Sequence, residues 1–217
     1  MVLGIYGASG LGREVLELAK SINAVEKKWE RYIFIDDGDV SSIVNGINVY
    51  TYEQAMVDFA GNLEIILGIG EPSTRERLFK KIQNDEIPLT TLIHPQVHIP
   101  DTTFVGKGAV IQDGCFISCN VVIGDYTFIQ PHATIGHDVK IKEGAIVSSL
   151  CGLSGSVSIG KYVYIGVGTV VREGISIGDY SIIGMASAVH KDIPDEVIAM
   201  GNPARPMKKN EAHHVFG

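Results

Sequence analysis

Two histidines and a carboxylate lie close together in the segment QPHATIGHD, residues 130–138, in which Asp138 directly follows His137. A neutral imidazole can accept a proton near neutral pH, and a carboxylate beside its Nδ1 fixes the tautomer and raises the basicity of the ring. The pair His137 and Asp138 therefore predicts a general base with its orienting acid, and a solvated surface residue is the alternative for His137. For His132, five residues earlier, a solvated surface residue is the favoured interpretation.

The segment lies within an internal repeat, which must position these side chains. An aliphatic residue recurs at every sixth position of this repeat. Most residues two positions before these aliphatic residues are small or β-branched, and glycine directly follows many of them, as in VIGDYT and SIGKYV. One aliphatic and one small residue per face fit the inside of a triangular solenoid, and glycine allows a tight corner. The aliphatic residues recur at every sixth position: Ile93, Ile99, Val105, Ile111, Ile117, Ile123, Ile129, Ile135, Ile141, Val147, Leu153, Ile159, Ile165, Val171, Ile177, Ile183 and Val189.

This repeat, from Ile93 to about Val189, resembles that of the hexapeptide-repeat acyltransferases. The resemblance implies a left-handed parallel β-helix with three hexapeptides per turn, and a homotrimer that buries one side of each helix. Residues eighteen positions apart are then expected to stack. His137 would lie above Cys119 and below Gly155, and His132 between Gly114 and Leu150.

A zinc site of the kind found in hexapeptide-repeat carbonic anhydrases is an alternative for the two histidines. A catalytic zinc ion needs about three protein ligands. The other candidates are His94 and His98, but the positions that stack under His132 and His137 hold no histidine. We therefore expect no metal. Cys119 as a nucleophile is a further alternative, less favoured than an inert thiol.

The first ninety residues alternate strand and helix patterns, which predicts a small α/β unit with a parallel sheet. Its glycine-rich turn, YGASGLGREVLEL at residues 6–18, follows a strand and opens a helix, the context in which such a turn can hold a phosphate. Asp36 and Asp37 end the next strand, where an acid can meet a ribose hydroxyl or a base edge. Tight packing of the glycines is the alternative. The expected strands are 2–6, 32–35, 64–69 and 89–93, and the expected helices are 13–22, 52–59 and 73–84.

A dinucleotide-dependent dehydrogenase does not fit this unit, because it ends before residue 95 and lacks the second half that a dinucleotide occupies. A single nucleotide is the better match. The segment GIGEPSTRERL, residues 68–78, supplies a second glycine turn before a helix that could close over the same ligand.

An α/β nucleotide pocket followed by hexapeptide repeats resembles the sugar acyltransferases of the NeuD/PglD type over nearly the whole chain. These are sialic acid O-acetyltransferases and N-acetyltransferases of UDP-4-amino-4,6-dideoxy sugars. The resemblance implies His137 as general base and Asp138 as its orienting acid. It implies substrate contacts at Gly7, Ala8, Ser9, Gly10, Leu11, Gly12, Asp36, Asp37, Gly68, Ile69, Gly70 and Gln130.

The ending GNPARPMKK, residues 201–209, resembles the segment with which hexapeptide acyltransferases enclose coenzyme A. Arg205, Lys208 and Lys209 could meet its phosphates, and solvation is the alternative for each. This chain departs from the family at Gln130, often asparagine there, and at Ile146, sometimes histidine there, so the exact sugar is open. The resemblance implies coenzyme contacts at Ile146, Gly155, Val167, Met185, Asn202, Pro203 and Arg205.

Composition limits the partners. The net charge of −7 argues against nucleic acid and against an anionic membrane surface, which both require a basic face. Three cysteines without a CxxC pattern predict a reducing compartment, so a cytoplasmic location is expected, and no apolar stretch reaches the length of a membrane span. The expected organisation is a nucleotide-sugar-binding Rossmann-like domain at 1–92, a β-helix acyltransferase domain at 93–193 and a coenzyme-covering tail at 194–217.

The resemblance thus implies an enzyme that moves an acetyl group from acetyl-CoA to the C4 amine of a UDP-linked 4-amino-4,6-dideoxy-N-acetyl sugar of the bacillosamine type. Alternatives are O-acetylation of sialic acid or another sugar, and N-acetylation of a dTDP-linked amino sugar. A trimeric scaffold whose front domain senses nucleotides is the non-catalytic alternative. It is disfavoured because packing requires neither the pair His137 and Asp138 nor the GNPA ending.

Overall fold

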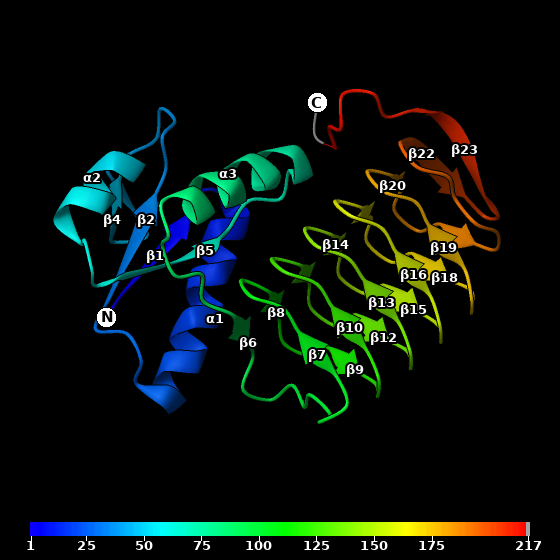
Figure 1. Ribbon diagram of the computed structural model, residues 1–217, viewed down its shortest axis with the longest axis horizontal. Coiled ribbons are helices and arrows are strands. Elements are labelled where there is room, and N and C mark those ends of the chain that lie inside the picture. Colours follow the sequence, from blue (N-terminus) through cyan, green and yellow to red (C-terminus); the bar gives the residue numbers. More distant parts are fainter. Residues whose placement is uncertain (216–217) are drawn as a thin grey trace.

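The computed structural model describes residues 1–215 and consists of an N-terminal α/β unit beside a long β-helix (Figure 1). The sheet of the α/β unit has the order β3-β4-β2-β1-β5 and is parallel except for the pair β3 and β4. Its elements are β1 (Val2–Tyr6), α1 (Gly10–Glu26), β2 (Arg31–Ile35), β3 (Ile43–Val44), β4 (Ile47–Tyr50), α2 (Tyr52–Asp58), β5 (Leu63–Leu67) and α3 (Pro72–Asn84).

The predicted helices and the first three predicted strands are confirmed, with ends that differ by a few residues. The hairpin of β3 and β4 was not predicted, since its strands have only two and four residues and are too short to show a clear pattern. The fourth predicted strand, 89–93, is wrong. Leu89 forms one bridge to Ile65, and the chain then leaves the α/β sheet, so that only β6 (Leu92–Ile93) is a strand and it pairs with the β-helix.

The β-helix is built of parallel two-residue strands that form three sheets, each strand pairing with the one eighteen residues later, as Phe128 does with Ile146. We call these sheets I, II and III. Sheet I holds β6, β8 (Val110–Ile111), β11 (Phe128–Ile129), β14 (Ile146–Val147), β17 (Tyr164–Ile165) and β20 (Ile182–Ile183); sheet II holds β9 (Phe116–Ile117), β12 (Thr134–Ile135), β15 (Gly152–Leu153), β18 (Val170–Val171) and β21 (Ala188–Val189); sheet III holds β7 (Phe104–Val105), β10 (Val122–Ile123), β13 (Lys140–Ile141), β16 (Ser158–Ile159) and β19 (Ser176–Ile177).

The predicted six-residue repeat is confirmed, because its aliphatic residues form the interior of the prism from Ile111 to Val189. Ile129, Val147 and Ile165 are fully buried there. The small residues two positions earlier are also buried, among them Cys115 and Cys151, whose thiol pKa values burial raises to about 11. The structure therefore has an α/β unit followed by a parallel β-helix of six-residue repeats, which confirms the predicted fold class.

The predicted reason for the glycines that follow the repeat residues is wrong. These glycines do not have a positive φ; they are required because the next coil passes too close for a side chain. A Cβ at Gly124 would lie 2.6 Å from the backbone nitrogen of Glu143, and one at Gly136 would lie 2.8 Å from that of Gly155. The left-handed corners fall two residues later, at every sixth position, and many carry side chains, including Asn120 and His132.

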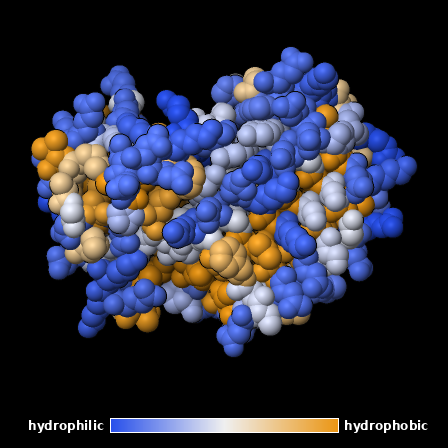
Figure 2. Space-filling model, viewed as in Figure 1, coloured by the Kyte–Doolittle hydropathy of each residue, from blue (hydrophilic) through white to orange (hydrophobic). Residues whose placement is uncertain are grey.

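The α/β unit and sheet I share an apolar cluster, in which Leu3, Ile5 and Leu16 pack with Val110 and Phe128. Apolar side chains also form a band over the solvent-facing coils in Figure 2, bordered by polar residues. The face of sheet I that meets the α/β unit is therefore covered, whereas sheets II and III are open in the single chain.

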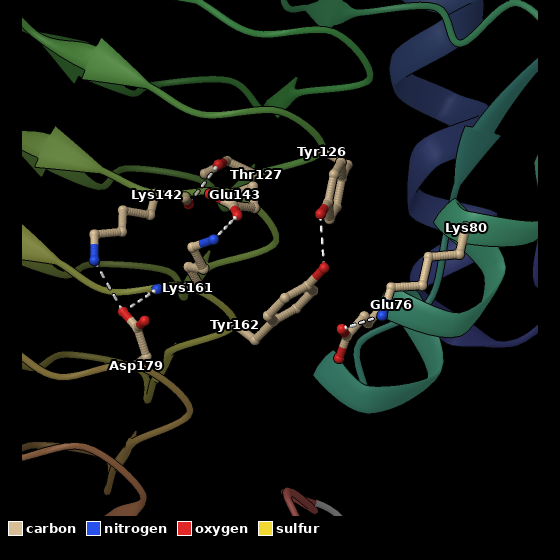
Figure 3. A network of polar contacts seen from close by, with 9 residues as sticks. All are labelled: Glu76, Lys80, Tyr126, Thr127, Lys142, Glu143, Lys161, Tyr162 and Asp179. Carbon is tan, nitrogen blue, oxygen red and sulfur yellow. Dashed lines mark hydrogen bonds and ion pairs between the residues drawn. The ribbon is translucent and has the colours of Figure 1, made fainter. Parts of the chain in front are cut away.

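Helix α3 makes a second, polar and aromatic contact with the β-helix. The Arg75 side chain is fully buried, donates to the carbonyl oxygens of Ile69 (3.0 Å) and Tyr126, and lies over the Phe128 ring. Phe79 stacks on Tyr126, whose hydroxyl lies 2.7 Å from that of Tyr162. Figure 3 shows this pair between α3 and the coils, with Glu76 and Lys80 of α3 opposite.

The chain ends with the hairpin of β22 (Val197–Gly201) and β23 (Ala204–Lys209), which extends sheet I. The segment after it returns toward α3, where the backbone N–H of Val215 donates to the Glu71 carboxylate at 3.1 Å. Residues 216–217 of the predicted tail lie outside the described residues. Within residues 1–215, none of the helices combines the length and apolarity of a membrane span.

Candidate active site

His137 and Asp138 form an exposed pair on the β-helix. Asp138 Oδ2 lies 2.8 Å from His137 Nδ1, and its Oδ1 accepts a hydrogen bond of 3.2 Å from the amide of Asn120. The hydrogen bond with His137, followed by that with Asn120, lowers the pKa of the Asp138 carboxyl. The charged carboxylate can therefore hold a proton on Nδ1, which leaves Nε2 as the free acceptor of the ring.

The pair occupies the turn between β12 and β13, which we call the His137 corner (turns 118–120, 136–138, 154–156 and 172–174). Asp138 is the left-handed residue of this turn, with φ 59, and its N–H donates to the carbonyl of Cys119 at 3.1 Å. Aspartate tolerates this conformation better than most residues. Asn120, stacked one coil earlier, was missed as the second partner of Asp138, although the eighteen-residue period places it there.

The His137 ring covers Gly155, as the predicted stacking implies. A Cβ at Gly155 would lie 2.5 Å from both Nε2 and Cε1 of His137. The backbone at Gly155 does not have a positive φ, so alanine is disfavoured there only by the imidazole. Gly155 therefore sets where the free nitrogen of His137 can lie.

Gly155→Ala is expected to lower the rate of acetyl transfer about tenfold, because it displaces a ring whose position a general base requires. The melting temperature should change little, since the displaced side chain is exposed. Steady-state kinetics and thermal unfolding measure the two effects. The matched control is Gly152→Ala on the same coil, where a Cβ meets its nearest atom at 3.6 Å. Equal activities of the two variants would contradict this positioning role.

The two histidines of QPHATIGHD lie at different corners. His132 belongs to the turn between β11 and β12, which we call the His132 corner (turns 112–114, 130–132, 148–150, 166–168 and 184–186). Its ring lies against Gly114, as predicted. Among residues 1–215, no three or more His, Cys, Asp and Glu side chains are arranged to hold a metal ion. Cys119 is a free cysteine and is exposed at the His137 corner.

The residues predicted to contact the coenzyme lie in different parts of the structure: at the His132 corner, on β23 and at the His137 corner. Val167 and Met185 are exposed at the His132 corner, with 44% and 77% of their surface accessible. Asn202 and Pro203 lie in the hairpin loop at the same corner, next to Gly201, whose N–H donates to Ser187. Arg205 is exposed on β23 and donates to the carbonyl of Ala204, whereas Gly155 lies at the His137 corner. Lys208 and Lys209 are exposed near the end of β23.

The prediction for Ile146 is wrong. Ile146 lies on sheet I in the cluster shared with the α/β unit, and only 1% of its surface is accessible. It packs there with Phe128 and the apolar residues of β1 and α1, so it cannot line a solvent-accessible coenzyme site. The spacing from His137 alone could not reveal that the α/β unit covers this position.

The predicted glycine-rich turn forms the loop between β1 and α1, and its binding of a phosphate stays a prediction. Most of its glycines have a packing reason. A Cβ at Gly12 would overlap the carbonyl of Gly7, and a Cβ at Gly68 would lie 2.7 Å from Gly12 Cα, so the turns at 7–12 and 68–70 interlock. Gly10 differs, because the nearest atom to a Cβ there is 3.9 Å away, on Arg13. The exposed N-terminus of α1 around Ser9 and Gly10 is therefore the part of the turn that packing leaves free for a ligand.

Asp36 and Asp37 already serve the loop. Asp36 accepts the backbone N–H groups of Ala8 (2.9 Å) and Gly38 (3.0 Å), and Asp37 accepts Tyr52 N–H (2.8 Å) and Tyr6 Oη–H (2.5 Å). Burial raises the pKa of the Asp37 carboxyl, but these hydrogen bonds outweigh it and the net shift is downward. Both carboxylates hold the loops around them in place, and their contact with a nucleotide stays a prediction. Substrate contacts of Leu11, which is half-buried, and of Ile69 and Gly70 in the second turn also stay predictions.

The comparisons with known proteins agree with both parts of the chain. Residues 2–82 match the PglD N-terminal domain, and residues 120–155 match the bacterial transferase hexapeptide (six repeats). GDP-perosamine N-acetyltransferase of Escherichia coli O157:H7 is 29% identical over 214 residues, which cover 95% of this chain and 96% of that protein.

Solved structures of similar proteins superpose over nearly the whole chain. WeeI from Acinetobacter baumannii AYE is 28% identical with a TM-score of 0.89, over 95% of this chain and all of that one. The acetyltransferase domain of PglB from Neisseria gonorrhoeae FA1090, in complex with acetyl coenzyme A, is 26% identical with a TM-score of 0.88, over 95% and 98%. A variant of perosamine N-acetyltransferase from Caulobacter crescentus, in complex with CoA and GDP-perosamine, is 26% identical with a TM-score of 0.88, over 96% and 98%.

Proposed function

We propose, on the premise that this chain is a hexapeptide-repeat sugar acyltransferase of the NeuD/PglD type, that it transfers the acetyl group of acetyl-CoA to the amine of a nucleotide-linked amino sugar. The observation that carries this proposal is the His137–Asp138 pair, 2.8 Å apart at an exposed corner of the β-helix. The relatives that bind CoA or acetyl coenzyme A, and in one case also GDP-perosamine, support it.

The proposed reaction is a direct attack. The sugar nitrogen adds to the thioester carbon, its proton passes to His137 Nε2, and the tetrahedral intermediate then expels the CoA thiolate, which takes up the proton. The new N–C bond replaces the C–S bond, and no acyl-enzyme forms. Asp138 holds the imidazole and stabilises its protonated form. A backbone N–H, such as that of Gly155, would stabilise the oxyanion, a contribution worth about 3 kcal/mol in enzymes where such a donor has been removed.

We further propose a homotrimer with its active sites between subunits. Sheet II carries Phe116 and Val170, which are 60% and 53% exposed, and Leu150 at the His132 corner is 62% exposed. Large exposed apolar side chains on one face favour self-association. If sheet II faces a threefold axis, the His137 corner of one subunit meets the His132 corner of the next. The coenzyme candidates Val167, Met185, Asn202 and Pro203 would then face the His137 of a neighbouring subunit.

For the acceptor we propose a UDP-linked 4-amino-4,6-dideoxy-N-acetyl sugar of the bacillosamine type, used in glycan or glycoprotein synthesis. The alternative, favoured by the relatives, is GDP-perosamine, which is likewise a nucleotide-linked amino sugar. The nucleotide would lie at the N-terminus of α1, against Ser9 and Gly10, with Gln130 of the β-helix toward the sugar. We also propose a cytoplasmic location, since all three cysteines, Cys115, Cys119 and Cys151, are free.

Release of free thiol from acetyl-CoA tests the function. The panel contains a UDP-linked 4-amino sugar, GDP-perosamine, a dTDP-linked amino sugar and sialic acid as a hydroxyl acceptor. We expect thiol release with a nucleotide-linked amine and none with sialic acid. Release with sialic acid alone would replace the amine by a hydroxyl acceptor. No release with any acceptor would favour the scaffold interpretation.

A further inference from the structure

A crevice that the mechanism above does not use separates α1 from the His132 corner. Its cavity volume is about 430 Å³, and its walls include Glu14 and Glu17 of α1 and His94, Gln112, Asp113 and Ser149 of the coils. The crevice begins about one helical turn beyond Gly10, because α1 starts at that residue. It therefore lies between the proposed nucleotide position and the proposed subunit boundary.

One wall of the crevice contains a buried polar atom without a partner. Gln112 is 5% exposed, and its Oε1 accepts no hydrogen bond from any described residue. Gln130, one coil later in the same column, differs, because its Oε1 accepts the N–H of Ser149 at 3.2 Å. Ser148, the third residue of the column, is fully buried, and its hydroxyl also has no partner within residues 1–215. A buried polar atom left unpaired costs free energy, so a donor from a ligand would stabilise this site.

The charge of the crevice indicates which ligand it can hold. Its lining includes three carboxylates and no lysine or arginine among the described residues. Glu17 is paired with Lys20 at 2.8 Å, so Glu14 and Asp113 are the carboxylates with which a ligand would interact most strongly. Such a lining repels phosphate and attracts hydroxyl, amine and ammonium donors.

We propose that this crevice binds the amino-sugar part of the nucleotide-linked substrate and that Gln112 is a specificity-determining residue, whose Oε1 accepts a hydrogen bond from the sugar. This inference rests on the proposed function and adds to it the place of the sugar. The carboxylates attract the sugar while its amine is protonated, and this ammonium group loses one proton to solvent before the neutral amine attacks the thioester. The acetylated product is a neutral amide and loses this attraction, which favours its release.

Gln112→Leu tests the proposal by titration calorimetry. The probes are the nucleotide-linked amino sugar that the wild-type protein acetylates fastest and its free nucleoside diphosphate. The Kd of the amino-sugar nucleotide should rise about tenfold, as expected for the loss of one buried hydrogen bond, while the Kd of the free diphosphate stays within about twofold. The melting temperature should not fall, because an apolar residue replaces a buried side chain whose amide oxygen has no partner among the described residues. Gln83→Leu, at an exposed glutamine of α3, is the matched control.

An unchanged Kd for the amino-sugar nucleotide would overturn the proposal, and so would an equal loss for both probes. If Gln112→Leu does not fold, the double variant Glu14→Gln and Asp113→Asn serves instead, because both residues are exposed. It should lower the preference for the amine substrate over its acetylated product severalfold, and an unchanged preference would count against the crevice. Failure of the proposed function looks different, since the wild-type protein would then release no thiol with any amino sugar.

Discussion

Replacement of His137 by alanine is expected to lower kcat for acetyl transfer by ~10²–10⁴-fold, the range that a positioned general base contributes. The amine then has no acceptor for its proton as the N–C bond forms. The melting temperature should stay within about 2 °C of the wild-type value, because 55% of the His137 side chain is exposed and changes at exposed positions cost little stability.

The control for this variant is His190→Ala. His190 is an exposed histidine three coils further along at the end of sheet II, and it takes no part in the proposed chemistry. Single-turnover thiol release and calorimetry on both variants separate the interpretations. If His137→Ala keeps normal turnover per folded molecule but unfolds at a much lower temperature, His137 is a structural residue.

Asp138 stays ionised at neutral and mildly acidic pH because its pKa is lowered, so it should not titrate between about pH 5 and 8.

The second large effect is expected on stability, from Arg75→Ala. The guanidinium is fully buried, and burial lowers the pKa of Arg75 to about 10, which still leaves it charged at neutral pH. Alanine would remove the donor to Ile69 and Tyr126, leave a cavity beside Phe128 and separate α3 from the coils. Unpaired buried carbonyl groups and the cavity together should lower the free energy of unfolding by about 3–5 kcal/mol.

For a chain of this size, such a loss lowers the melting temperature by roughly 10 °C. Arg77→Ala is the matched control, since Arg77 lies two residues further along α3 and is exposed. It should change the melting temperature by no more than about 2 °C. Differential scanning calorimetry compares the two variants. A variant at position 75 that is as stable as the wild-type protein would show that the buried guanidinium is not needed to join α3 to the β-helix.

Periodicity explains why so much of the β-helix could be predicted. Each aliphatic residue of the repeat occupies an equivalent interior position, so the sequence determines the coil length, the columns and the stacking of His137 on Gly155. The same arithmetic places Asn120 beside Asp138. The glycines were misinterpreted because period alone does not distinguish a left-handed corner from a close approach between coils, and the structure shows the latter at Gly124.

The features that could not be predicted depend on contacts between distant parts of the chain. From the sequence, Arg75 in α3 would be expected at the surface. Its burial depends on the contact with Tyr126, which is 51 positions later in the chain. Ile146 looks like a site residue until the α/β unit covers it. The separation of His132 and His137 onto two corners follows from the strand β12 between them, but the use of each corner depends on the neighbouring subunit that we propose.

The strand β6 has a consequence for protein engineering. Its two residues belong to different interiors, because the side chain of Leu92 packs with the α/β unit and that of Ile93 packs against the core of the β-helix. A chimera that exchanges the first unit to alter nucleotide preference cannot be joined cleanly at this peptide bond. The new unit would need side chains that are complementary to Val110, Phe128 and Ile146 of the β-helix. Its design therefore has to match this apolar interface as well as the point at which the two chains are joined.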